Sequence, residues 1–132
     1  MNRQAFLGFF VFLSVAIVLC TLSHPASASG ITREIVPLER DGVHLECLKA
    51  EDSGEKEPLL MVHGLTYSSH EFDVNYGDYS LARFLAQNGY AVWLLDIAGY
   101  GSSQPVEDGF KPNSDYAAED IAAAVRLILE KS

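Results

Sequence analysis

The chain has 132 residues, of which 48% are hydrophobic, and its formal net charge is −9. This length predicts a single domain. The acidic balance argues against nucleic acid as a partner, because proteins that bind nucleic acid need lysine and arginine beside the phosphates. It identifies no other partner, because acidity mainly keeps a globular protein soluble.

The start of the chain has the layout of a secretory signal. Arg3 precedes an uncharged, mostly apolar run over residues 5–22, and the small residues Ala-Ser-Ala occupy positions 26–28. We therefore predict that residues 1–28 are a signal peptide and that residues 29–132 are exported, secreted or otherwise extracytoplasmic. The alternative is a membrane anchor, because the apolar run is just long enough to span a bilayer and would allow membrane association.

Three strands are predicted in the first part of the exported chain. The first covers residues 31–38, and the Asp-Gly pair at 41–42 is a strong hairpin turn because both residue types tolerate positive φ. Apolar and polar residues alternate from 43 to 47, which predicts a half-buried second strand with Cys47 as a small core residue. The continuous apolar run over residues 59–62 predicts a third strand that is buried on both faces.

A helix and a fourth strand are expected next. The helix covers residues 79–88, with Leu81, Phe84 and Leu85 on its apolar face and a glycine after it as a stop signal. Residues 90–96 follow as another strand buried on both faces.

A loop rich in glycine and proline then leads to a last helix, which begins near Ser114 or Asp115. Its apolar stripe has the spacing i, i+3, i+4, i+7 and consists of Ile121, Ala124, Val125 and Ile128. A hairpin followed by alternating strands and helices predicts an α/β fold, with a mostly parallel sheet and an N-terminal antiparallel hairpin.

Two stretches, LLMVHGLTYSSHEFD and YSLARFLAQNGYAVWLLDIAGYGSS, resemble the α/β-hydrolase fold family. The features that carry the resemblance are His63-Gly64 after the third strand, the pattern Asp96-x-x-Gly99-x-Gly101-x-Ser103 after the fourth, and the helix DYAAEDIAAAVRLIL. The resemblance covers residues 31–131 and corresponds to the first part of such a domain.

The resemblance implies a role for the His-Gly loop. In the family the backbone N–H after His-Gly points into the oxyanion hole, and here that N–H belongs to Leu65. A fixed N–H stabilises the negative charge of a tetrahedral intermediate without reorganising. Gly64 is expected to let the backbone come close, and His63 to support the loop, because the catalytic histidine of the family comes last in the chain.

The second motif is expected to shape the loop after the fourth strand. The resemblance implies that Asp96 caps this loop and that Gly99 and Gly101 permit its turns, with Ser103 completing the pattern. These glycines are no dinucleotide fingerprint, because Gln104 stands where a third glycine is needed. No cofactor is therefore expected.

A metal site is not expected either. The three imidazoles of the exported part are those of His44, His63 and His70, and three imidazoles are enough to hold zinc. Their spacing matches no metal-binding motif, however, and surface or supporting roles are more common for scattered histidines.

The nucleophile of the family is absent from the sequence. No serine has glycine two residues before and after it, as the pattern Gly-x-Ser-x-Gly requires; Ser103 follows Gly101 at that offset but precedes Pro105. In the family this serine, the acid and the catalytic histidine all follow the helix that begins near residue 114. We therefore expect a protein truncated before the nucleophile elbow.

The function predicted is that of an N-terminal fragment of an exported hydrolase, inactive alone, whose complete form acts on carboxylic esters or lipid acyl groups. Four aromatic residues after the His-Gly loop either line an acyl pocket or pack the loop: Tyr67, Phe72, Tyr76 and Tyr79. The alternative is a non-catalytic binding module, secreted or tethered to a membrane, that keeps part of the hydrolase fold.

Overall fold

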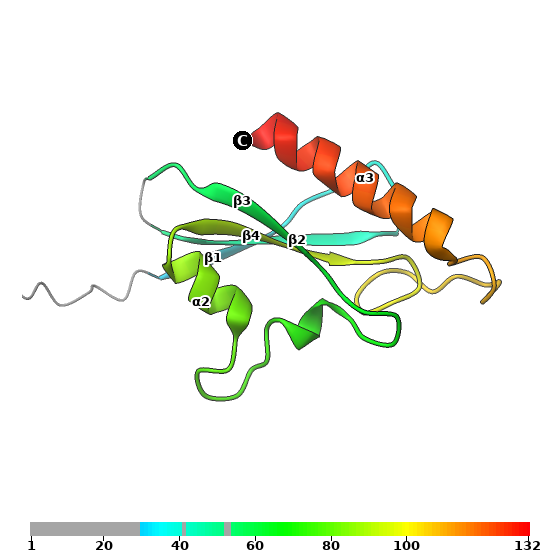
Figure 1. Ribbon diagram of the computed structural model, residues 1–132, viewed down its shortest axis with the longest axis horizontal. Helices are drawn as coiled ribbons and strands as arrows, with labels where there is room; N and C mark the ends of the chain where they lie inside the picture. Colours follow the sequence, from blue (N-terminus) through cyan, green and yellow to red (C-terminus); the bar gives the residue numbers. More distant parts are fainter. Residues whose placement is uncertain (1–29, 41, 52–53) are drawn as a thin grey trace, which may run out of the picture.

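The computed structural model describes residues 30–40, 42–51 and 54–132. Its elements in chain order are β1 (Ile31–Ile35), β2 (His44–Ala50), β3 (Glu57–Val62), the short 3-10 helix η1 (Ser69–Glu71), α2 (Leu81–Gln87), β4 (Tyr90–Asp96) and α3 (Ser114–Lys131). Figure 1 shows one twisted sheet with α2 against one face and α3 against the other. The segment predicted as signal or anchor lies outside the described residues. Within these residues no helix is both long and apolar enough for a membrane span.

The four strands form one mixed sheet in the order β1-β2-β4-β3. β1 pairs with β2 and β2 with β4 in antiparallel fashion, whereas β3 and β4 are parallel, with Leu60 opposite Trp93. The parallel pair is the one that a helix, α2, connects, as parallel strands require a crossover. The predicted α/β-hydrolase-like fold with an N-terminal antiparallel pair is thereby confirmed.

Side chains of β4 alternate between the two faces of the sheet, as the two-residue period of a strand dictates. Trp93 and Leu95 belong to the core cluster on the α3 face, whereas Val92 and Leu94 belong to the cluster on the α2 face. All four are buried, so the prediction of a doubly buried fourth strand is confirmed. Cys47 is also a buried core residue, as predicted.

The prediction that the third strand is buried on both faces is wrong. The residues of β3 are half-buried or exposed along their whole length. The reason is its position, because β3 is an edge strand of the described sheet and only β4 lies beside it. A sequence pattern reports the hydrophobicity of a strand but not the number of its neighbours.

A further difference concerns the first hairpin. β1 ends at Ile35, three residues before the predicted end. Pro37 explains the early end, because proline has no N–H for the strand ladder. Gly42 has φ +78°, as the turn requires, whereas Asp41 lies outside the described residues.

The helix α2 is shorter than the predicted range 79–88, and the residues that it turns toward the sheet differ from those predicted. Ser80 is its N-cap, and the Ser80 Oγ accepts the Arg83 N–H at 3.0 Å. The predicted face is wrong for Leu81 and Phe84, which are 47% and 59% exposed, while Ala82 and Ala86 are buried. Alanine lets a helix backbone approach the sheet closely, so the small residues occupy the contact.

The last helix begins at Ser114, as predicted, and Asn113 caps it through a hydrogen bond from the Tyr116 N–H to Oδ1 at 3.0 Å. Ala124 and Ile128 of the predicted stripe are buried. Val125 is 40% exposed, so the stripe is narrower than predicted.

Candidate active-site loop

His63 lies directly after β3 and is 5% exposed. Its Nδ1 is 2.8 Å from the Gly64 carbonyl oxygen, and its Nε2 accepts the Ile97 N–H at 3.1 Å. A nitrogen that accepts from an N–H carries no proton, so the proton of the ring is on Nδ1, where it donates to Gly64. Both nitrogens are therefore engaged, and the ring connects the end of β3 to the residue after β4.

The loop that follows is held from within by Glu71. The Gly64 N–H donates to Glu71 Oε1 at 3.2 Å, and the Tyr67 N–H donates to the Gly64 carbonyl at 3.1 Å. In the described part of the chain, no hydrogen bond engages the Leu65 N–H. The side chain of Leu65 is 79% exposed. The arrangement thus presents a backbone donor on a fixed loop, which is what an oxyanion hole requires.

Gly64 is not required by the packing of the described residues. A Cβ at this position would lie 3.5 Å from Tyr67, an ordinary contact, and Gly64 is not among the glycines with positive φ. The close backbone approach that the resemblance implies stays a prediction, as does the donation from Leu65.

Asp96 connects the two loops. It is 2% exposed, and its carboxylate accepts the Ser69 N–H at 2.7 Å through Oδ1 and the Ser102 N–H at 2.8 Å through Oδ2. Ser69 begins η1 and Glu71 ends it. A short chain of contacts therefore runs from Asp96 through η1 to the Gly64 N–H.

Hydrogen bonds hold the Ser103 side chain in place within the same loop. Its Oγ donates to the Asp96 carbonyl at 2.6 Å and accepts the His44 N–H at 2.8 Å, and the residue is 7% exposed. A buried hydroxyl with both a donor and an acceptor role filled is a structural group. Gly99 has φ +85°, and its N–H donates to the Gln104 carbonyl at 3.1 Å, which closes the turn.

Sequence reasoning missed a second buried carboxylate, that of Asp120 on α3. It is fully buried, accepts the Ala98 N–H at 3.0 Å and accepts Arg40 Nε at 2.8 Å. Arg40 Nη2 is 2.7 Å from Asp120 Oδ1 without hydrogen-bond geometry, so this second contact is an ion pair. The signal available in the sequence was an acid next to the apolar stripe of the helix. Such an acid needs a partner when it is buried.

A third buried acid, Asp73, lies where the chain turns from η1 toward α2. It accepts the Ser80 hydroxyl at 2.6 Å, contacts Arg83 Nε at 3.0 Å and is paired with Arg33. Burial alone would raise the pKa of Asp73, but the hydrogen bonds from Ser80 and Arg33 and the charges of the two arginines hold this pKa below its ordinary value.

The aromatic residues after the His-Gly loop divide into two groups. Tyr67, Tyr76 and Tyr79 are 61%, 74% and 73% exposed, and Tyr76 stacks on Tyr79 with ring centroids 6.0 Å apart. Phe72 packs against the core cluster beside α2. Phe72 thus serves packing, and the other three are exposed on the surface.

No group of three or more metal-ligating side chains occurs in the three described ranges. The histidines named above are accordingly not brought together there.

A family model described as alpha/beta hydrolase fold matches residues 57–132, which is more than half of the chain. The chain belongs to the α/β-hydrolase fold family. The match begins with β3 and includes the His-Gly loop, Asp96 and α3.

Solved structures show the same fold. An epoxide hydrolase mutant of Vigna radiata is 19% identical, with a TM-score of 0.53 over 74% of this chain and 27% of that one. A predicted CIB-like hydrolase of Thermoplasma acidophilum is 21% identical, with a TM-score of 0.52 over 74% of this chain and 46% of that one. A membrane phospholipase A, described as a bacterial virulence factor, is 22% identical, with a TM-score of 0.51 over 96% of this chain and 41% of that one. The chain thus spans less than half the length of each of these structures.

Proposed function

We propose that this chain is the N-terminal part of an exported hydrolase of carboxylic esters, including lipid acyl esters, in which the Leu65 N–H stabilises the oxyanion. The observation that supports the proposal is a backbone donor without a partner among the described residues, on a loop fixed by His63, Glu71 and Asp96. In water, the solvent molecules that stabilise a developing charge must reorient. A backbone N–H that is fixed in a fold is already in place.

Ester hydrolysis is the acyl transfer that we propose, because a donor of this kind serves acyl chemistry. Attack on an acyl carbon moves charge onto the carbonyl oxygen, and the loss of one such donor typically costs about 10²–10³ in kcat. The attacking serine, its base and the acid that orients the base are not in this sequence, which has no Gly-x-Ser-x-Gly. The proposal therefore includes the inactivity of this chain alone.

The free side of β3 supports the proposal that more of a domain belongs here. β3 pairs with β4 only, so its other edge has backbone groups without strand partners in the described sheet. Such an edge is a template for another strand.

A first experiment tests inactivity. The purified chain is incubated with a chromogenic acetate ester, with a chromogenic epoxide as the comparison substrate, and with a fluorophosphonate probe. We expect no turnover above buffer and no labelled serine. Stoichiometric labelling of Ser102 or Ser103 would contradict the proposal.

A second experiment tests the role of Leu65 in an active protein. The nucleotide sequence after codon 132 is determined in the source genome, and a continued frame that encodes Gly-x-Ser-x-Gly is expressed whole. Leu65→Pro removes the N–H and also fixes φ at residue 65, and kcat should fall about 100-fold or more with little change in KM. Leu65→Ala is the matched control, because it keeps the N–H and the side chain is exposed. Equal kcat in both variants would show that Leu65 is not the oxyanion donor. A stop codon with no further gene piece would favour the non-catalytic binding module.

A third experiment tests export, which rests on the sequence layout of residues 1–28. The chain is expressed with its own N-terminus, and the recovered protein is sequenced from its first residue. We expect a new N-terminus at Ser29 outside the cytoplasm. An intact Met1 form in the membrane fraction would favour the anchor instead.

A further inference from the structure

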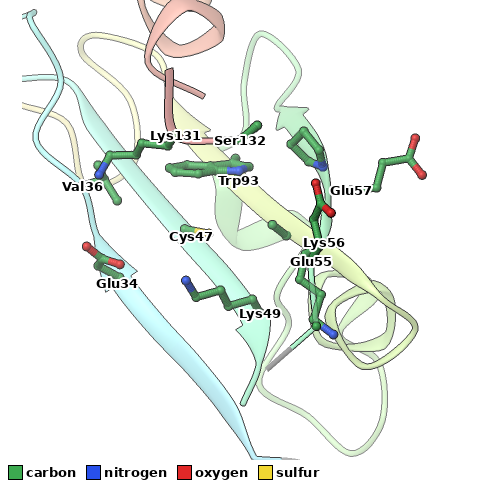
Figure 2. Close-up of a pocket in the computed structure, with 13 residues that line it drawn as sticks. Glu34, Val36, Cys47, Lys49, Glu55, Lys56, Glu57, Trp93, Lys131 and Ser132 are labelled. Carbon is green, nitrogen blue, oxygen red and sulfur yellow. The ribbon is translucent and has the colours of Figure 1, made fainter. Parts of the chain in front are cut away.

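A pocket lies at the amino-terminal ends of β3 and β4, at the opposite end of these strands from the His-Gly loop. Its volume is about 750 Å³, within the range of about 300–1,000 Å³ that is usual for small-molecule sites. In Figure 2, Glu34 and Val36 lie on one side and residues 55–57 on the other, with Cys47 and Trp93 between them.

The floor of this pocket is apolar. Val36, Cys47 and Trp93 are 3%, 4% and 6% exposed, so their side chains are packed in place. Burial raises the pKa of the Cys47 thiol, which keeps the floor uncharged. A hydrocarbon chain of a ligand that displaced water from these side chains would be stabilised by the burial of apolar surface.

Donors without acceptors surround this floor. The Nε1–H of Trp93 is buried and has no hydrogen-bond partner within the described ranges. Lys49 and Lys131 also line the pocket, and neither ammonium has a carboxylate within ion-pair distance in the part of the chain that the structure describes. Buried N–H groups are nearly always satisfied, so the Trp93 Nε1–H is open to an acceptor on a ligand.

Three acidic residues line the pocket and oppose an anion: Glu34, Glu55 and Glu57. Glu34 lies on the same side of the pocket as Val36, between the positions of Lys49 and Lys131 in Figure 2. Its carboxylate adds a repulsive charge to that of the ligand, so its removal should tighten the binding of an anion and weaken that of a cation.

We propose that this pocket binds a monocarboxylate with an apolar tail, such as a short fatty acid. The tail lies on Val36, Cys47 and Trp93, and the carboxylate accepts hydrogen bonds from Lys49 and Lys131. The site uses no residue of the His-Gly loop, so it goes beyond the proposed function.

Trp93 is the only tryptophan of the chain, which makes it a reporter. The full chain is labelled with ¹⁵N-tryptophan and held in phosphatidylcholine nanodiscs with unlabelled scaffold, so that one indole cross-peak is observed. Octanoate is titrated, with octanol and octylammonium as controls at equal concentration. We expect the cross-peak to move with octanoate and reach saturation. No movement, or an equal movement with octylammonium, would overturn the proposal.

Variants test the carboxylate contacts. Lys49→Met with Lys131→Met changes two exposed side chains and should weaken octanoate binding at least tenfold, whereas Glu34→Gln should tighten it severalfold. Lys111→Met is the matched control, because Lys111 does not line this pocket. Its affinity should equal that of the unaltered chain, and an unchanged affinity in the double variant would refute the assignment.

Discussion

The carboxylate of Asp96 lies where a side chain of residue 101 would have to stand. A Cβ built on Gly101 would be 2.3 Å from Asp96 Cγ, and Gly101 has φ +53°. Steric space and backbone conformation both demand glycine here. The same carboxylate accepts the Ser69 and Ser102 N–H groups, so the fit of glycine against Asp96 determines the position of both loops.

We therefore expect Gly101→Ala to destabilise the loop by about 1–3 kcal/mol, the usual cost of a strained backbone or an overpacked site. The measurement is amide hydrogen exchange in the full chain, where Ser69 and Ser102 should lose protection. Gly109→Ala is the matched control, because nothing lies within 4 Å of a Cβ there and its φ is not in the strained range. Equal protection in the two variants would contradict the role of Gly101.

A second prediction concerns His63. His63→Phe keeps a flat, buried ring but leaves the Ile97 N–H without its acceptor, and a buried unpaired donor costs about 1–3 kcal/mol. Exchange of the Ile97 amide should accelerate, while amides in the middle of β4 should change little. Unchanged exchange at Ile97 would mean that the ring does not connect the two strands.

The motif residues were the predictable part of the site. His63 directly follows β3 and Asp96 ends β4, which are neighbouring parallel strands, so their motifs had to meet at one edge of the sheet. Glu71 was not predictable, because a glutamate in a polar loop carries no periodic signal. Its hydrogen bond to Gly64 depends on the path of η1, which Asp96 fixes from another part of the chain.

The order of the elements was predictable, and so was the burial of β4, but the burial of β3 and α2 was not. Apolar residues in β3 and α2 predicted contact with the core, and both segments contact it. How deeply they are buried depends on neighbours in space, since β3 is at an edge and α2 presents alanines to the sheet. Asp120 shows the same limit, because only the position of Arg40 and Ala98 explains a buried charge.

A third prediction concerns Asp120. Asp120→Ala leaves the Ala98 N–H without its acceptor, and Arg40, which is 23% exposed, keeps only its ion pair with Glu119. A buried unpaired donor costs about 1–3 kcal/mol. Glu119→Gln removes the other, exposed ion pair of Arg40 and should cost at most about 1 kcal/mol. Exchange of the Ala98 amide distinguishes the two variants. Equal acceleration of Ala98 amide exchange in both variants would show that the burial of Asp120 does not determine the strength of its contacts.

A fourth prediction concerns pH. The folded-state pKa of Asp73 is lowered, so its ionised form contributes stability above its unfolded pKa of about 3.9, and this contribution is lost as the pH falls through the lower, folded value. Protection of the Ala82 amide, which donates to the Phe72 carbonyl at 2.9 Å, should fall in that acid range after correction for intrinsic exchange. Asp73→Asn should remove this dependence, whereas Glu130→Gln, an exposed control, should keep it. The same acid loss in both variants would assign it to other groups.

The last prediction concerns the open edge of β3. Half-buried apolar side chains beside unpaired backbone groups favour association of one chain with another. The isolated piece 29–132 should therefore be poorly soluble, bind a hydrophobic dye and unfold without a sharp transition. Leu59 is half-buried on this strand, so Leu59→Lys should place a charge at the edge and reduce association.

Leu129→Lys adds the same charge on α3, where Leu129 is 69% exposed, and serves as the control. If the edge causes association, light scattering and dye binding should fall with Leu59→Lys and change less with Leu129→Lys. Equal improvement would mean that net charge alone governs solubility. A monomeric piece with a steep two-state melt would show that the four strands and two helices form a complete cooperative unit without another strand beside β3.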